Sequence, residues 1–280
     1  MRMLSRRSRG FTLVEMVTVI LVLGVLAVGV SSFIIFGTRI FIESSAVEQV
    51  TGESRYAIER MTRDIRSALP GSPRLASGSA GSESWQCLEL VPIAASSSYV
   101  ALGLAPGPAA KTATVFRDAP VSTVAAGQWA FVYPLTSDDV YGSFPGNLGK
   151  RFVLEKVTAS ASSIELEFPN AVRFAEASPR RRMYFSNQPV SYCFVQSLGG
   201  GGINLWRYGN YGFSAAQPDL LTLRANGSAA LMAQNLTSPQ PLSLQGSTLI
   251  NNAVVQMAIG FAVNGQTFEY QHQVQMINVP

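Results

Sequence analysis

The sequence predicts an α+β fold in which a long N-terminal helical spine packs on a β-rich globular domain. The chain is almost entirely apolar from Phe11 to Phe36, and from Arg39 to Leu69 apolar residues recur at steps of three or four. Such spacing places apolar side chains on one face of a helix. After Pro70 the pattern changes to short stretches that alternate between apolar and polar residues, which is typical of half-buried strands.

The formal net charge of +4 does not indicate a nucleic-acid binder once its position is considered. A nucleic-acid interface needs its basic residues on the folded body. Here the side chains from Phe11 onward are formally neutral, because the whole excess lies ahead of Gly10. It comes from Arg2, Arg6, Arg7 and Arg9.

The apolar segment Phe11–Phe36 is long enough to cross a membrane as a helix. At about 1.5 Å per residue it reaches about 39 Å, more than the apolar thickness of a bilayer. Arginines on its N-terminal side alone place that end in the cytoplasm and the body outside. An ordinary secretory signal has its small-residue cleavage site after the apolar run. Here the small residue, Gly10, stands before it, so we expect a cut ahead of the span.

Glu15 is the one acidic residue in the apolar segment. A carboxylate there costs on the order of 3 kcal/mol on insertion scales and needs a partner. A cut after Gly10 would create an α-amino group on Phe11, which points along the axis of its own helix and meets Glu15 poorly. On a staggered neighbouring subunit, the amine and the carboxylate would attract each other in lipid-like surroundings. The alternative is a snorkelling or protonated Glu15 at the membrane interface.

The run Gly10-Phe11-Thr12-Leu13-Val14-Glu15 resembles the class III signal of type IV pilins and type II secretion pseudopilins. The resemblance implies that a prepilin peptidase cleaves after Gly10 and methylates the amine of Phe11. It also implies that Glu15 serves in filament assembly and that the fold is pilin-like. The resemblance covers about the first 40 residues and says nothing about the body.

We divide the chain into a cleaved leader at 1–10, a transmembrane and assembly half-helix at 11–38, an amphipathic half-helix at 39–69 and a globular domain at 70–280. Pro70-Gly71 ends the helix. The predicted buried stripe is Val47, Val50, Ser54, Ile58, Met61, Ile65 and Ala68. The opposite, solvated face is predicted to carry Arg39, Glu43, Glu48, Glu53, Arg55, Glu59, Arg60, Arg63, Asp64 and Arg66.

The body is predicted to be one β-rich domain with long loops. Leu75–Ser84, rich in Ser, Gly and Ala, predicts a flexible connector. Asn264-Gly265 between two apolar runs predicts a type I′ hairpin. The expected strands are Cys87–Ile93, Thr112–Phe116, Gln128–Tyr133, Lys150–Val157, Ile164–Phe168, Met183–Phe185, Val190–Gln196, Ile203–Tyr208, Ala253–Ala262 and Thr267–Val279.

The two cysteines, Cys87 and Cys193, are too far apart in sequence for a CxxC redox site or a spaced zinc site. In an exported domain they are compatible with one disulfide. That bridge would close a loop of roughly 100 residues, which is worth about 4–5 kcal/mol in the chain-entropy model. The alternative is two buried thiols, because cysteine packs well as a small apolar residue.

Features that would indicate chemistry are weak in the body. His272 is the only histidine, and nothing in the sequence marks a nucleophile or an orienting group for it. Gly199–Gly202 lacks the lysine and the following helix of a phosphate loop. Asp138-Asp139 lacks the spaced oxygen ligands of a calcium loop. We therefore expect no catalytic residue, no metal, no cofactor and no enzymatic activity.

An aromatic run near the middle of the body has two interpretations. Trp206, Tyr208 and Tyr211 are candidates for a ligand surface that stacks on sugars or contacts a partner. The alternative is a packed strand and turn, because aromatic side chains dominate protein cores as well as interfaces.

Segments spread along the body are similar to the MshO proteins of the mannose-sensitive haemagglutinin (MSHA) pilus system. The resemblance implies a minor pilin that primes or caps the pilus tip during pilus biogenesis and serves adhesion and surface attachment. The segments are Arg55–Arg60 with Leu69-Pro70, Cys87–Ile93, Val190–Cys193 and Gln273–Pro280.

The implied partners are the prepilin peptidase and N-methyltransferase, the inner-membrane pilus assembly platform, the major pilin and other minor pilins. The implied location is the bacterial inner membrane, as a single-pass prepilin with its N-terminus in the cytoplasm and its body in the periplasm, and then the pilus or cell surface. Alternatives are a PilW-like minor pilin of twitching pili or a GspJ-like type II secretion pseudopilin. A membrane-anchored glycan-binding adhesin or a periplasmic enzyme is the alternative from another class.

We predict that Gly10→Val blocks processing, because it replaces the small residue at the cleavage site with a bulky one. N-terminal sequencing of the membrane-extracted protein checks this. A shortened product of the variant that starts at Phe11 would contradict the assignment of the site.

Overall fold

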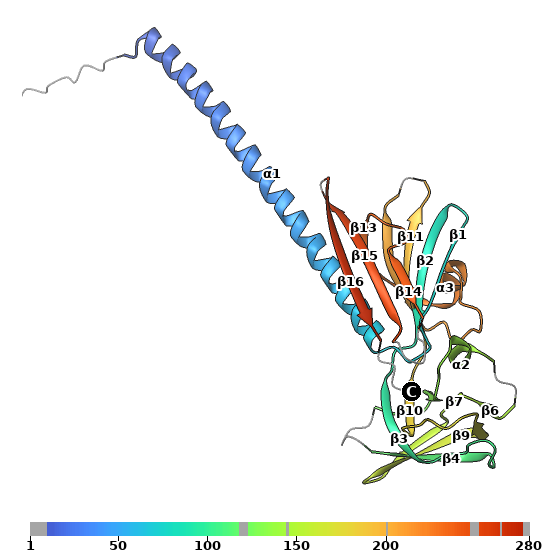
Figure 1. The fold of residues 1–280 in the computed structure, drawn as a ribbon. Helices are drawn as coiled ribbons and strands as arrows, with labels where there is room; N and C mark the ends of the chain where they lie inside the picture. Colours follow the sequence, from blue (N-terminus) through green and yellow to red (C-terminus); the bar gives the residue numbers. More distant parts are fainter. Residues whose placement is uncertain are drawn as a thin grey trace, which may run out of the picture. The chain divides into compact units, whose positions relative to one another are not determined.

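The computed structural model describes residues 10–117, 123–143, 146–199, 201–246, 252–263 and 265–276. It contains two compact units, Met1–Gln49 and Val50–Pro280. The predicted fold class is confirmed: a long N-terminal apolar helix is followed by a β-rich globular domain (Figure 1).

The long helix α1 spans Leu13–Arg66, whereas the sequence predicts a helix that continues to Leu69. It ends early because the backbone that follows pairs with another segment. Leu69 N donates a hydrogen bond to Val91 O, and Ile93 N donates one to Ser67 O, both at 2.8 Å. The last turn of the predicted helix is therefore an extended connection to the sheet.

Gly71 allows the chain to turn away after this connection. Its φ of 73° lies in the left-handed region that favours glycine. A Cβ at this position would lie 2.8 Å from the backbone carbonyl carbon of Leu135, so a larger residue would also collide with a neighbouring loop.

The first sheet of the body is antiparallel and has eight strands. In sheet order they are β1 (Arg74–Ala80), β2 (Glu83–Leu90), β11 (Val190–Ser197), β12 (Ile203–Gly209), β13 (Ser228–Leu236), β15 (Val254–Val263) and β14 (Leu242–Gln245), with β16 (Gln266–Gln275) beside β15. β16 pairs with one side of β15, and β13 and β14 share the other side. The predicted hairpin between β15 and β16 is confirmed, although Asn264 of its turn and residues 277–279 of the predicted last strand lie outside the described residues.

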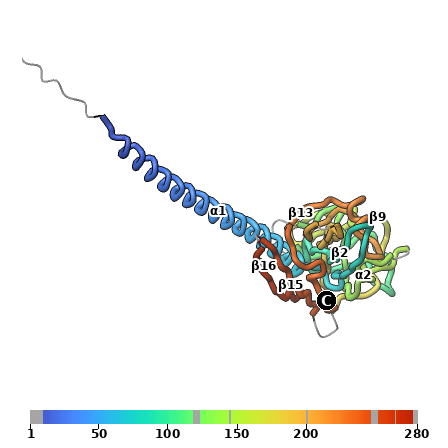
Figure 2. The backbone as a smooth tube through the Cα atoms, turned by 90° about the horizontal axis from the view of Figure 1, so that it is seen from above, coloured from blue at the N-terminus to red at the C-terminus, as the bar shows by residue number. Residues whose placement is uncertain are grey.

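The part of α1 from Val50 onward covers this sheet and lies beside β15 and β16 (Figure 2). The predicted stripe is confirmed where it is most apolar, because Ile58, Met61, Ile65 and Ala68 are all buried. They pack with large apolar side chains of the sheet. These include Leu88, Tyr192, Phe194, Leu205, Val255 and Ile259.

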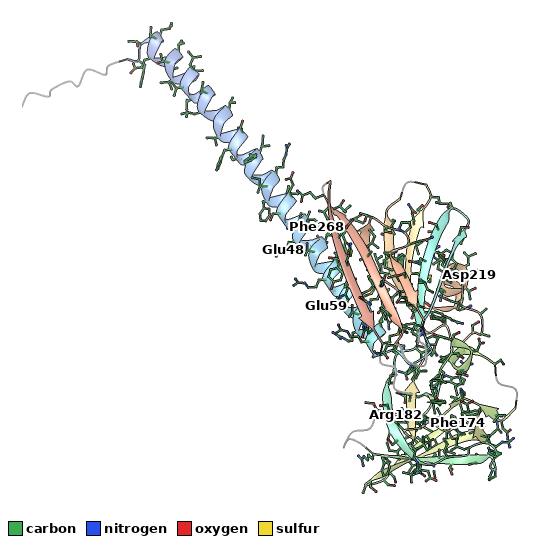
Figure 3. The ribbon with its side chains drawn as sticks, in the orientation of Figure 1. Glu48, Glu59, Phe174, Arg182, Asp219 and Phe268 are labelled. Carbon is green, nitrogen blue, oxygen red and sulfur yellow. A yellow bond between two sulfur atoms is a disulfide. The ribbon has the colours of Figure 1, made fainter. Side chains whose placement is uncertain are left out.

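The second sheet is an insertion into the first. All of its strands lie, in sequence, between β2 and β11, whose ends Leu90 and Val190 are paired with each other. It has its own core, in which Phe152, Phe168 and Phe174 form edge-to-face contacts with ring centroids 5.0–6.2 Å apart (Phe174 is labelled in Figure 3). In sheet order the strands are β6 (Leu148–Gly149), β9 (Ser163–Phe174), β4 (Ala110–Phe116), β3 (Ala95–Ala101), β10 (Arg182–Ser186), β5 (Trp129–Val132) and β7 (Arg151–Val153), with β8 (Lys156–Ala159) beside β9.

An aromatic side chain from the first sheet's β12–β13 connection joins the two sheets. Phe213 packs against Trp129, Phe131 and Tyr141, with ring centroids 5.2–6.1 Å away. The guanidinium of Arg151 lies 4.5 Å from the centre of the Phe213 ring, and burial lowers the pKa of Arg151 to about 10. Tilted aromatic pairs and cation–π contacts of this kind each contribute about 1 kcal/mol beyond area burial.

The connector predicted at Leu75–Ser84 is wrong. β1 and the start of β2 occupy it and pair in register from Arg74 opposite Glu89 to Ala80 opposite Glu83. Strand β1 is an edge strand whose small side chains carry no apolar alternation, so only its pairing with β2 identifies it as a strand.

The strand predicted at Lys150–Val157 is also corrected, because it is broken into β7 and β8. At the break, Leu154 N bonds to Gln128 O while Glu155 N bonds to Glu167 O, so the two halves follow different neighbours. The sequence likewise misses β3, β6 and β14, which are polar or short. It also misses β13, whose pairing with β12 shifts register twice.

The structure joins Cys87 and Cys193 in a disulfide, which settles the alternative left open by the sequence. The two residues lie directly opposite each other on β2 and β11, and both are fully buried. The bridge spans a sequence separation of 106 residues, and the whole second sheet lies within that loop.

We predict that reduction under denaturing conditions raises the intact mass of the purified chain by two hydrogen atoms. Removal of the bridge, as in Cys87→Ala with Cys193→Ala, should lower the free energy of unfolding by about 4 kcal/mol because the loop is long. Intact mass spectrometry and denaturant unfolding measure the two quantities. An unchanged mass after reductant would show that the bridge is absent.

Candidate assembly segment and sites on the body

Three described residues, Gly10, Phe11 and Thr12, precede the helix. The hydroxyl of Thr12 accepts a hydrogen bond from Glu15 N at 3.3 Å, so Thr12 caps the first turn of α1. Thr-x-x-Glu is the spacing of a capping box, and an acidic residue in the first turn favours the positive end of the helix dipole. Thr18 donates its hydroxyl to Glu15 O at 3.0 Å. Gly10 and Phe11, the predicted processing pair, precede this cap and are exposed.

The apolar half of α1 exposes its large side chains. Leu13 is 81% exposed and Phe33 is 77% exposed, and the other large apolar residues as far as Ile42 are also exposed. Among the described residues, α1 is the one helix long and apolar enough to cross a membrane. Contiguous apolar surface of this extent is unfavourable in water and indicates burial in lipid or against other helices.

Residues 5–31 match the family model of the prokaryotic N-terminal methylation motif. This match includes Gly10, Phe11 and Glu15. The N-terminal segment is type IV pilin-like. The match ends inside α1, so it leaves the body of this pilin-like protein unassigned. Comparisons with curated proteins and with solved structures returned no match.

The prediction that Trp206, Tyr208 and Tyr211 form a ligand surface is wrong for Tyr208, because that side chain is buried. Tyr208 is only 1% exposed and packs beside the disulfide with Leu220 and Leu223. Trp206 is half-buried against the same cluster. Tyr211 is also half-buried, and its hydroxyl faces inward. The run therefore forms a packed strand and turn, the alternative that the sequence left open.

Tyr211 belongs to a buried polar cluster around Glu89, which is fully buried on β2. The carboxylate accepts hydrogen bonds from Arg74 and, at 3.0 Å, from the Tyr211 hydroxyl. Burial raises the pKa of Glu89, and the contacts with Arg74 and Tyr211 oppose that rise. Arg74 also donates to the carbonyls of Ser214 and Ala215, so the cluster fixes the loop that carries Phe213.

A second polar cluster connects α1 to the first sheet. Asp64 accepts hydrogen bonds from the Tyr192 hydroxyl at 2.7 Å and from Arg207 Nη2 at 3.2 Å. Arg60 Nε lies 3.3 Å from the other carboxylate oxygen, close enough for an ion pair but not aligned as a hydrogen bond. Burial, followed by the charge of Asp64, raises the pKa of Tyr192, and Asp64 also raises the pKa of Arg60.

The sequence analysis places Asp64 on the solvated face of α1, and this is wrong because Asp64 is 6% exposed. Its position contains a signal that could have identified it. Ala57, Met61, Asp64 and Ala68 follow one another at steps of four, three and four, so Asp64 lies on the buried stripe itself.

The remaining candidates have structural roles. Asp139 completes a capping box with Thr136 at the start of the short helix α2 (Ser137–Tyr141) and pairs with Lys150 at 3.2 Å. His272 lies on β16 beside the ring of Tyr270. The other short helix, α3 (Leu220–Asn226), is capped by Asp219, which Figure 3 labels. Gly200, within the predicted glycine turn, is outside the described residues.

We predict that Asp64→Ala lowers the free energy of unfolding by about 3 kcal/mol, because it leaves Arg207 and the Tyr192 hydroxyl without their buried acceptor. Denaturant unfolding of the full chain in detergent measures this. Glu59→Ala is the matched control, since Glu59 is an exposed acid on the same helix (Figure 3), and its effect should stay within about 0.5 kcal/mol. Equal effects of the two substitutions would contradict the anchoring role of Asp64.

Proposed function

We propose that this pilin-like protein is a minor pilin of an MSHA-type type IV pilus, incorporated at or priming the pilus tip, and that it is not an enzyme. The observation that carries the proposal is the exposed apolar half of α1, most of which lies within the N-terminal methylation motif. Such a surface becomes stable when membrane lipid, and later the helices of other subunits, cover it.

The proposed course of assembly follows from the order of segments. The leader at 1–10 is removed by the prepilin peptidase, 11–38 anchors the chain in the inner membrane, 39–69 supports the body, and 70–280 lies in the periplasm until the subunit enters the pilus. The assembly platform would then transfer α1 from lipid into the filament. There it would pack against the major pilin and other minor pilins.

Glu15 would set the register of that packing. The α-amino group of a processed Phe11 lies about 6 Å along the helix axis from Glu15, so a neighbour shifted axially by a similar distance brings the opposite charges together. At a separation of 4 Å and an effective dielectric constant of about 20, the attraction is roughly 4 kcal/mol. An attraction of this size would favour one stagger over others.

The MSHA assignment is supported by the arrangement of the segments that resemble MshO proteins. Cys87–Ile93 and Val190–Cys193 are distant in sequence, yet Cys87–Leu90 of the first pairs with Val190–Cys193 in the first sheet, and the two segments contain both halves of the disulfide. The large body, with two sheets, also favours a subunit present in few copies. A PilW-like pilin or a GspJ-like pseudopilin would share the N-terminal segment, and the neighbouring genes distinguish these systems.

We predict that Glu15→Ala leaves membrane insertion and cleavage intact but reduces incorporation into sheared filaments by about tenfold or more, as expected for a lost interaction above 1.4 kcal/mol. Immunoblots of sheared and membrane fractions measure the ratio. Glu43→Ala, an exposed acid farther along the same helix, is the control and should behave as wild type. Wild-type filament content with Glu15→Ala would contradict the assembly role.

A further inference from the structure

A pocket of about 380 Å³ opens beside the Asp64 cluster on the body. It lies where the end of α1 meets the Pro92–Ala94 connection, the turn before β11 and the end of β12. Its volume falls within the range of roughly 300–1,000 Å³ that is usual for small-molecule sites.

The lining of this pocket has an excess of positive charge. Arg60, Asp64 and Arg207 are its only charged residues within the described part of the chain, so two guanidinium groups face one carboxylate. Asp64 is buried. One of its oxygens accepts hydrogen bonds from Tyr192 and Arg207, and the other lies 3.3 Å from Arg60 Nε, so this single carboxylate pairs with both guanidinium groups and leaves one net positive charge. The side chains of Arg60 and Arg207 are 39% and 25% exposed, so the uncompensated charge is accessible to a ligand.

Neutral polar groups line the same pocket, and two of them are held in place. The amide of Asn210, a residue with a positive φ of 61°, donates to the Ser228 hydroxyl at 3.1 Å. The amide oxygen of Gln188, which also lines the pocket, accepts from Gly212 N at 3.3 Å, and its amino group is a hydrogen-bond donor. Asn187 adds a third amide.

An apolar wall completes the lining, formed by Pro92, Ile93, Pro189 and Val190. A carboxylate alone would use the arginines and leave the amides, the hydroxyl and this wall without contacts. A ligand that uses all of them has one carboxylate, several hydroxyl groups and a face of C–H bonds. Those are the properties of a uronic or sialic acid residue.

We propose that this pocket binds an acidic monosaccharide. The ligand carboxylate pairs with the guanidinium groups of Arg60 and Arg207, where charge-assisted hydrogen bonds are strongest. The sugar hydroxyls bond to Asn187, Gln188 and Ser228, and the ring lies against the proline wall. The site is independent of α1's apolar half, so it does not rest on the proposed place in a filament.

The test is calorimetric titration of the full chain in detergent with three probes. D-glucuronate carries both the carboxylate and the hydroxyls, D-glucose is its neutral counterpart, and acetate supplies the carboxylate alone. We expect glucuronate to bind at least about tenfold more tightly than either control, since each charged hydrogen bond is worth about tenfold in affinity. Equal affinity for glucuronate and glucose, equal affinity for glucuronate and acetate, or no binding of glucuronate at about 20 mM would each overturn the proposal.

Arg60→Gln should weaken glucuronate binding by about tenfold or more and leave any weak glucose binding unchanged. Arg63→Gln is the matched control, because it removes the same charge from an exposed position of the same helix that does not line the pocket. Asn187→Ala is a second variant that leaves the Asp64 cluster intact and should weaken glucuronate binding as well. An equal loss with Arg63→Gln, or full affinity with both pocket variants, would show that the ligand does not bind here.

Discussion

The apolar half of α1 imposes the constraint on which the biology of this protein depends. From Leu13 to Ile42 the helix presents large apolar side chains that nothing in the chain's own fold covers among the described residues. Glu15 interrupts this surface near its start. Lipid can solvate the apolar side chains but not the carboxylate, whereas a neighbouring helix with a free amine can satisfy both. The proposed function therefore places this segment first in lipid and later against neighbouring helices.

In the body, each of the two sheets has its own apolar core, and contacts at the joint between the sheets hold the two cores together. Each sheet buries its own apolar side chains, and the joint between them is partly polar. Glu89 and Arg74 fix the loop that carries Phe213, and Phe213 fills the apolar gap at the joint. A buried ion pair adds little net stability over apolar packing, but its loss is costly. The Glu89–Arg74 pair therefore serves to fix the position of the Phe213 loop at the joint between the sheets.

Local patterns in the sequence predict the N-terminal methylation motif, the long apolar helix and the apolar part of its buried stripe, because spacing decides which helix face is buried. They also identified the β15–β16 hairpin. They fail at Asp64. Its charge predicts a solvent-facing side chain, whereas its spacing of three residues from Met61 places it on the buried stripe. They failed at β1 too, since small polar residues form that strand through pairing with β2. The division into two sheets depends on contacts between distant residues, which periodicity does not contain.

The second sheet leaves and re-enters the first at adjacent positions. Leu90 and Val190 face each other across neighbouring strands, and the disulfide between Cys87 and Cys193 links these strands close to the two ends of the insertion. The second sheet is therefore a self-contained insertion between β2 and β11. Because its two ends are adjacent and bridged, a change in the length of the inserted sheet would leave the pairing of β2 with β11 in register.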